Sequence, residues 1–120
     1  MDWKPWILLG VGLGVVYLIK RSSLVAVDRA RALYAAGAQV IDVRSVGEFE
    51  SGHLPMASNM PLDELERILP ERIPDRNRVL LLHCLSGTRS GLARMQLRRM
   101  GYTQVHNLGS LSRAREILTP

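Results

Sequence analysis

Short runs of apolar residues along the chain predict three strands. Residues 39–43 are rich in β-branched side chains, residues 79–82 are continuously aliphatic, and residues 104–108 form a third candidate after the glycine at position 101. Continuous apolar runs of this length are typical of strands that are covered on both faces, as in a parallel sheet between helices. We therefore predict buried strands at these positions.

Helical patterns separate the predicted strands. Apolar residues recur at helical spacing, or a helical turn is indicated, in residues 25–36, 46–52, 62–69, 90–100 and 111–118. Residues 55–61 are predicted to be irregular or extended, and residues 70–77 to form a loop. In the helix over 90–100 we expect four side chains to face inward: Leu92, Met95, Leu97 and Met100. The alternation predicts an α/β sandwich, with a mainly parallel central sheet flanked by helices.

The N-terminal segment has a different pattern. Residues 6–19 contain no charged side chain. A helix of this length spans about 21 Å, whereas the hydrocarbon core of a bilayer is roughly 30 Å thick. Lys4, Lys20 and Arg21 extend the span by reaching the interface, where Trp3 and Trp6 are also favoured. We expect one uncleaved transmembrane helix that contacts the membrane through residues 3–21.

Two alternatives to the anchor were weighed. A buried core helix is disfavoured because the run is apolar on every face. A cleaved signal peptide fits the length of the run, but no clear cleavage site with small residues follows it. The chain is therefore divided into a membrane segment (1–21), a linker helix region (22–34) and a folded domain (35–119).

Charge predicts the orientation of this segment. Four cations follow the apolar run closely: Lys20, Arg21, Arg29 and Arg31. The positive-inside rule then places the domain in the cytoplasm, at the inner (cell) membrane, and the alternative is a periplasmic protein after signal cleavage. Gly10 and Gly14 have the spacing of a helix-pairing motif, so weak self-association of the membrane helix is also expected.

Composition narrows the function classes. The chain has 120 residues, a net charge of +5 and 47% hydrophobic residues, which is ordinary for one globular domain. Its cations are not interleaved with aromatic side chains, so nucleic-acid binding is not expected. One cysteine excludes an intramolecular disulfide. The three histidines (His53, His83 and His106) lack metal-ligand spacing, so we predict neither a metal nor a cofactor.

Two polar clusters follow predicted strands, where sites form in open α/β sheets. One is Asp42-Val43-Arg44. The other runs from His83 to Ser90 between a strand and a helix, and it contains Cys84. A lone cysteine is usually a small buried hydrophobe. Here, however, loop N–H groups, the helix dipole and Arg89 would all stabilise a thiolate, so we expect Cys84 to have a lowered pKa and to act as a nucleophile.

These residues resemble a known family. Cys84-x-x-Gly87-x-Arg89-Ser90 resembles the active-site loop of single-domain rhodaneses, which are thiosulfate sulfurtransferases. The upstream string from Val40 to Leu62, with Asp42-Val43-Arg44, Glu48-Phe49 and Gly52-His53-Leu54-Pro55, and the closing residues Gly101-Tyr102 and Asn107-Leu108-Gly109 resemble further motifs of the family. The resemblance covers residues 35–117 and is greatest to the small phage-shock rhodaneses.

The resemblance implies a mechanism and roles for individual residues. Cys84 would take the sulfane sulfur of thiosulfate as a persulfide and pass it to a thiophilic acceptor. Backbone N–H groups of the loop would hold the persulfide, and its substrate-binding residues would be Leu85, Ser86, Gly87 and Thr88. Arg89 would orient the loop and add positive potential. Asp42 is expected to form structural hydrogen bonds, and Arg44 and Glu48 a structural ion pair.

Neither nearby histidine is expected to be a catalytic base. His53 belongs to a turn, and His83 is expected to point away from Cys84 because adjacent strand residues face opposite sides.

Two other functions stay open at this point. Rhodanese-related phosphatases and arsenate reductases share the fold, but their loops have one residue more between the cysteine and the arginine than the four found here. The shorter loop makes a smaller nest, suited to a sulfur atom. A membrane-tethered binding module without activity is the third candidate, although such modules typically lose the cysteine.

Overall fold

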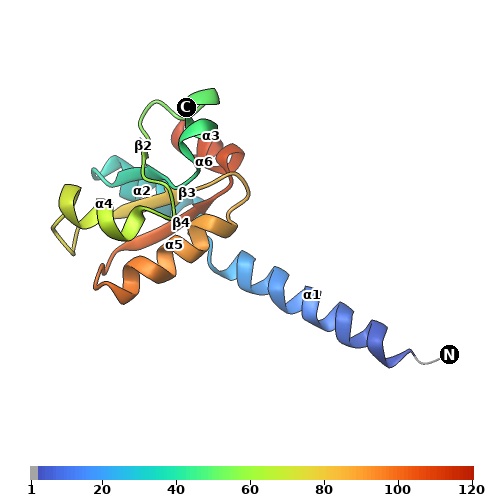
Figure 1. Cartoon of the computed structure of the whole chain (residues 1–120). Helices are drawn as coiled ribbons and strands as arrows, with labels where there is room; N and C mark the ends of the chain where they lie inside the picture. The colour runs from blue at the N-terminus through green and yellow to red at the C-terminus, as the bar shows by residue number, and fades with distance from the viewer. Residues whose placement is uncertain (1–2) are drawn as a thin grey trace.

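The central sheet of the protein is parallel throughout. The computed structural model describes residues 3–120, with no description of the side chains of residues 17–22. Within these residues four strands pair in the order β2-β1-β3-β4 (Figure 1). They are β1 (Gln39–Asp42), β2 (Ser58–Asn59), β3 (Leu80–His83) and β4 (Val105–Gly109). The predicted parallel sheet and its three predicted strands are confirmed as β1, β3 and β4.

Helices cover both faces of the sheet, as predicted. α4 (Leu65–Arg72) and α5 (Thr88–Arg99) pack on the face to which Ile41 and Leu82 point. α2 (Val27–Ala35) and α6 (Leu111–Leu118) pack on the other face, against Val40 and Leu81. Successive strand residues thus serve opposite cores, because side chains alternate across a strand. The short α3 (Val46–Ser51) follows β1 at its carboxyl end.

Two details of the elements differ from prediction, and one agrees with it. β2 lies in residues 55–61, which were predicted to be irregular or extended. α4 continues through Pro70 to Arg72, where a loop was predicted; proline already has a helical φ, and it removes only one hydrogen bond. Leu92 and Met95 do not face inward: they are 53% and 51% exposed. The buried face of α5 consists instead of Ser90, Ala93 and Leu97.

The N-terminal helix α1 (Lys4–Ser22) projects away from the domain (Figure 1). Its described apolar side chains are exposed, with Trp6 at 72% and Leu8 at 73%. No helix in the described part of the chain is long and apolar enough to cross a membrane, so the predicted transmembrane helix is not supported. The predicted contributions of Lys20 and Arg21 lie outside the described side chains.

The region predicted as a linker, residues 22–34, contains most of α2. Ala30 of this helix is fully buried in the core that α2 shares with α6. The Nε of Arg31 also donates a hydrogen bond to the carbonyl of Ile117 in α6, at 3.2 Å. α2 therefore packs as part of the folded domain.

Candidate active site

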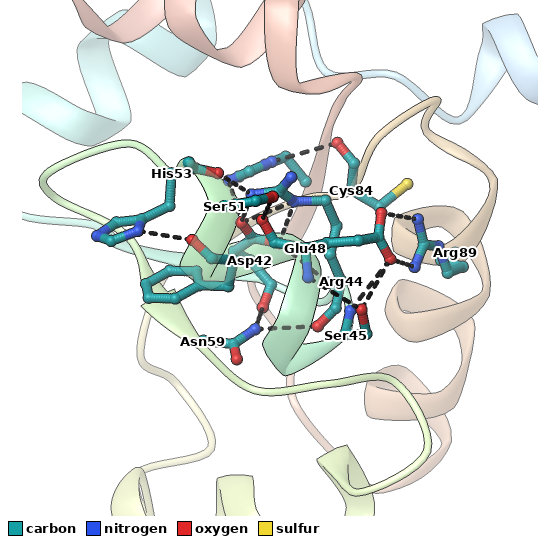
Figure 2. A network of polar contacts seen from close by, with 12 residues as sticks. Asp42, Arg44, Ser45, Glu48, Ser51, His53, Asn59, Cys84 and Arg89 are labelled. Carbon is teal, nitrogen blue, oxygen red and sulfur yellow. Dashed lines mark hydrogen bonds and ion pairs between the residues drawn. The ribbon is translucent and has the colours of Figure 1, made fainter.

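Cys84 lies directly after β3, at the carboxyl edge of the parallel sheet. The chain then turns through a short loop into α5, which begins at Thr88. Gly87 precedes the helix with φ of +96°, a left-handed conformation that residues with a Cβ rarely adopt. Figure 2 shows the sulfur of Cys84 beside this turn, with Arg89 nearby. The fold thus places the cysteine where sites form in α/β sheets.

The sulfur of Cys84 is buried and accepts two hydrogen bonds. The backbone N–H of Gly87 donates to Sγ at 2.9 Å, and the hydroxyl of Ser90 donates at 3.4 Å. Burial by itself raises the pKa of the thiol, but hydrogen bonds from the Ser90 hydroxyl and from the N–H groups of Ser90, Gly87 and Ser86 outweigh it. The net result is a pKa below the ordinary cysteine value. The site therefore favours the thiolate.

The predicted substrate-binding loop is placed in two parts. Gly87 and Ser86 contribute N–H groups that favour the thiolate, and Gly87 is buried. Leu85 and Thr88 are exposed, and the hydroxyl of Thr88 makes no hydrogen bond with the described residues. The carbonyl of Leu85 accepts a hydrogen bond from the N–H of Leu111 at 3.4 Å. Half of the predicted loop thus surrounds the sulfur, and the other half forms its outer rim.

Arg89 is held by a carboxylate. Its two terminal nitrogens donate to the two oxygens of Glu48 at 2.6 and 2.9 Å (Figure 2). The hydrogen bonds from Arg89 lower the pKa of Glu48 to about 2, and the same pair raises the pKa of Arg89. Glu48 also closes a capping box with Ser45 at the start of α3. Arg89 therefore joins α5 to α3 at the mouth of the site.

The predicted ion pair between Arg44 and Glu48 is wrong. Arg44 instead binds Asp42 through its Nε and Nη2, at 2.8–3.0 Å, and both side chains are buried. Arg44 also donates to the carbonyl of Gly52 at 2.7 Å. The predicted structural role of Asp42 agrees with these contacts, because the pair links the end of β1 to Gly52 at the end of α3. Removal of one partner from a buried pair costs about 3–5 kcal/mol.

The two nearby histidines have different surroundings. The ring of His53 stacks on Phe49 at 3.7 Å between centroids, and its Nδ1 lies 2.9 Å from the carbonyl of Phe49. His83 is buried, and its Nε2 lies 3.7 Å from Asp42 without a hydrogen bond. Burial lowers the pKa of His83 most strongly, against the opposing charge of Asp42. Within the described residues, neither histidine makes a hydrogen bond with the Cys84 sulfur.

Two residues of the site were missing from the sequence prediction. Ser90 supplies the side-chain hydrogen bond to the sulfur. Asn107 is fully buried in β4 and donates to the carbonyl of Gly87 at 3.2 Å, while its Oδ1 accepts from the N–H of Gly109 at 2.9 Å. Asn107 thus fixes the glycine whose N–H points at Cys84. Both residues occur in the motifs of the predicted loop and strand, but a motif does not say what its members contact.

An open cleft of about 600 Å³ lies next to the mouth of the site. It runs between α4 and α5, and its lining includes Arg89, Leu92, Met95, Asp63 and Glu66. No group of histidine, cysteine, aspartate and glutamate side chains in the described residues is arranged to hold a metal ion. The hydrogen bonds to the Cys84 sulfur and its place before the start of α5 are compatible with a sulfur nucleophile that acts on an anion.

Comparison with known proteins gives a consistent result. The family model for the rhodanese-like domain matches residues 26–113. The thiosulfate sulfurtransferase PspE of Escherichia coli (strain K12) is 38% identical over 71 residues, which cover 59% of this chain and 68% of PspE. The uncharacterized protein YqhL of Bacillus subtilis (strain 168) is 42% identical over 71 residues, which cover 59% of this chain and 55% of YqhL.

Solved structures show the same similarity. A rhodanese with anions from E. coli superposes with a TM-score of 0.61 at 35% identity, covering 64% of this chain and 91% of that one. The human single-domain sulfurtransferase TSTD1 superposes with a TM-score of 0.67 at 30% identity, covering 78% of this chain and 96% of that one. The residues matched by the family model, 26–113, contain the sheet, Cys84 and the loop that follows it.

Proposed function

The chain belongs to the rhodanese-like domain family, and on that premise we propose that it is a sulfurtransferase that uses Cys84 as its nucleophile. The proposed donor is thiosulfate or a related small anion with a sulfane sulfur. The proposed acceptor is a thiophile such as cyanide or a thiolate. A relative named as a thiosulfate sulfurtransferase supports this choice, as do the hydrogen bonds that the Cys84 sulfur accepts from Gly87 and Ser90.

In the first half of the proposed reaction, the Cys84 thiolate attacks the outer sulfur of thiosulfate. A new S–S bond forms at Cys84, the S–S bond of thiosulfate breaks, and sulfite leaves with the electron pair. The N–H of Gly87 and the hydroxyl of Ser90, which hold Sγ at 2.9 and 3.4 Å, lie where the thiolate carries its negative charge before this step; after it, the charge of the persulfide is on the outer sulfur. Preorganised donors of this kind stabilise charge without reorganisation.

In the second half, the acceptor attacks the outer sulfur of the Cys84 persulfide. The acceptor gains the sulfur, and the Cys84 thiolate leaves with the electron pair and is regenerated. The lowered pKa of Cys84 makes its thiolate a better leaving group than that of an ordinary cysteine. Arg89 is proposed to add positive potential at the mouth, although Glu48 neutralises much of its charge; its first role is to hold the loop and α3 in position.

One observation carries the proposal: a buried cysteine sulfur receives a backbone N–H and a hydroxyl hydrogen bond at the start of α5. The test is a steady-state assay of thiocyanate formation from thiosulfate and cyanide. Replacement of Cys84 by Ser should reduce the rate to below about 1% of wild type, since a hydroxyl is a poor nucleophile at neutral pH. Turnover of a phosphate ester without sulfur transfer would favour the phosphatase alternative instead.

We also propose that α1 attaches the protein to the cell membrane, with the domain on the cytoplasmic side. The support is the exposed apolar surface of α1, which includes Trp6 and Leu8, together with the exposed Trp3 just before the helix. The cations that follow the apolar run in the sequence also support it. Pairing of two copies through Gly10 and Gly14 belongs to the same proposal.

Fractionation of cells that express the full chain tests the attachment, and a reporter fused after Pro120 tests the side. We expect the chain in the membrane fraction with an intact N-terminus and a reporter active only in the cytoplasm. A shortened N-terminus together with a reporter active only in the periplasm would show that the segment is a cleaved signal peptide.

A further inference from the structure

A basic cavity lies where α1 joins the domain, and its lining includes neither Cys84 nor Arg89. It has a volume of about 250 Å³ and is bounded by residues 23–26, which lead from α1 into α2. Three basic side chains line it: Arg29 of α2, Arg94 of α5 and His106 of β4. These groups come from three separate elements, so the cavity is a product of the fold and not of one charged segment.

The basic groups of this cavity have no acidic partner among the described residues. None of the ion pairs in that part of the chain involves Arg29, Arg94 or the neighbouring Arg98. Asp28, which precedes Arg29, does not line the cavity. The Nε of Arg94 donates to the carbonyl of Val105 at 3.0 Å, which fixes its guanidinium at the edge of β4.

The pKa of His106 agrees with a cavity lined by positive charges. Burial lowers its pKa first, and the positive charges of Arg29, Arg94 and Arg98 lower it further. The ring also lies 3.4 Å from the amide oxygen of Gln104 through Nε2. An anion in the cavity would reverse the field and favour the protonated ring, which provides a local probe of binding.

The position of the cavity relates it to the proposed membrane attachment. Leu24 forms a bridge with Asn107 of β4, and the N–H of Val25 donates to the carbonyl of Asn107 at 2.9 Å. This contact fixes the chain immediately after the end of α1. In Figure 1 the helix leaves the domain from this edge, whereas α4 lies on the opposite side. If α1 is bound to a bilayer, the cavity is the part of the domain next to its surface.

We propose that this cavity binds the phosphate of an anionic phospholipid headgroup. Arginine side chains bind phosphate oxygens through two parallel hydrogen bonds, and two arginines that are not ion-paired can do so here. Basic groups close to a membrane segment contribute to binding of anionic lipid surfaces. The inference rests on the proposed attachment through α1 for the location of the bilayer, and it is independent of sulfur transfer.

The test measures partition of the full chain into vesicles. Vesicles of phosphatidylcholine alone report on α1, and the gain on adding phosphatidylglycerol reports on the cavity. We expect the gain in partition to be smaller by about tenfold or more for Arg29→Gln/Arg94→Gln, while the partition of this variant into neutral vesicles is unchanged. The matched control is Arg67→Gln/Arg72→Gln on α4, which removes the same charge far from α1 and should lose little, because charges beyond a Debye length are screened.

Since Arg94 also holds β4, Arg29→Gln alone is the second variant, and it should lose part of the gain. Equal losses in the cavity variant and the α4 control would overturn the proposal, as would no gain from phosphatidylglycerol. Failure to bind neutral vesicles would count against α1 and not against the cavity. Thiosulfate activity without vesicles should be the same in all variants.

Inorganic phosphate distinguishes a lipid from a free anion. The pKa of His106, followed by NMR, should rise when short-chain phosphatidylglycerol is added and respond much less to inorganic phosphate at the same concentration. If inorganic phosphate raises it equally and the cavity variant binds anionic vesicles like wild type, the cavity holds a free anion, and the lipid assignment is wrong.

Discussion

The ionisation of Cys84 is set by a few hydrogen bonds that compete with burial. A fully buried sulfur would ordinarily remain a thiol. Here Ser90 and Gly87 both donate to Sγ, and their combined effect lowers the pKa. The sequence predicted the lowered pKa but attributed it partly to Arg89, whose charge is in fact paired with Glu48. The reactive form of the site therefore depends more on short-range donors than on the nearby cation.

Replacement of Ser90 by Ala should shift the pH profile of Cys84 alkylation to higher pH. The hydroxyl stabilises the thiolate, so its loss raises the pKa, and the fraction of thiolate at neutral pH falls. We expect sulfur transfer at neutral pH to fall by roughly tenfold, the loss typical of one hydrogen bond to a charged group. The control is Ser112→Ala on α6. An unchanged alkylation profile in the Ser90 variant would mean that its hydroxyl does not act on the sulfur.

Replacement of Asn107 by Ala should affect both stability and the thiol. The variant leaves the carbonyl of Gly87 and the N–H of Gly109 without the partners they have now, which costs about 1–3 kcal/mol in unfolding free energy. Because Gly87 is then less well held, alkylation should also shift to higher pH. Urea unfolding and the alkylation profile measure the two effects. A loss of stability with no shift in alkylation would show that Asn107 is structural only.

Sequence reasoning identified Cys84 as the candidate nucleophile but not the contacts that surround it. Cys84 was identifiable because it follows an apolar strand and precedes a glycine and an arginine. The partner of Arg44 was predicted as Glu48, four positions away, whereas the structure pairs it with Asp42 across the end of β1. Asn107 acts on a loop twenty positions earlier. The Asn107 contact depends on which strands are neighbours, and that is not visible in the local pattern. The Asp42–Arg44 pair is local, and the sequence offered two carboxylates near Arg44 without distinguishing them.

At the scale of elements, the Glu48–Arg89 pair joins α3 to α5 across the mouth of the site. The pKa of Glu48 is lowered from 4.5 to about 2. A depressed carboxyl pKa contributes stability that is present above about pH 4.5 and is lost as the pH falls toward 2. Both side chains are about one-third exposed, at 36% and 32%. Solvent screening therefore limits the contribution to less than about 1 kcal/mol.

The difference in melting temperature between wild type and Glu48→Gln should therefore be small, positive and dependent on pH. We expect it to be constant above pH 4.5 and to decrease toward pH 2. Glutamine preserves the capping box with Ser45, so the comparison isolates the charge. Glu50→Gln on the same helix is the control. A difference that does not change over this range would show that the pair adds no charge-dependent stability.

The elements were predicted best where burial dominates. β1 and β3 lie in the centre of the sheet and follow directly from their apolar runs. β2 consists only of Ser58–Asn59, which is too short and too polar to give a strand pattern in the sequence. It is a strand because it pairs with β1. In α5, Leu92 and Met95 are three positions apart and share one face, but that face lines the cleft beside Arg89 and not the core, to which Leu97 belongs. A pattern of apolar residues cannot separate a core face from an exposed functional one.

At the scale of the whole molecule, one central strand connects both cores. Leu80 and Leu82 belong to the core under α4 and α5, and Leu81 belongs to the core under α2 and α6. Cys84 directly follows His83, the last residue of this strand. Its sulfur therefore lies at the end of a strand in which every residue is buried. The rigidity of the site thus follows from the packing of both layers.

Replacement of Leu82 by Ala should reduce the unfolding free energy by about 2–5 kcal/mol, because it opens a cavity in a fully buried position. Leu92→Ala is the matched control, since Leu92 is 53% exposed, and it should cost much less. Urea unfolding measures both. Similar losses in the two variants would contradict the assignment of these side chains to the core and to the surface.

The central claim is that Cys84 carries the transferred sulfur, and mass spectrometry of the full chain after incubation with thiosulfate tests it most directly. The account predicts a gain equal to the mass of one sulfur atom on the peptide that contains Cys84. The gain should be absent in Cys84→Ser and removed when cyanide is added. A Cys84 that stays unmodified after thiosulfate, although its thiol still reacts with an alkylating reagent, would contradict the account.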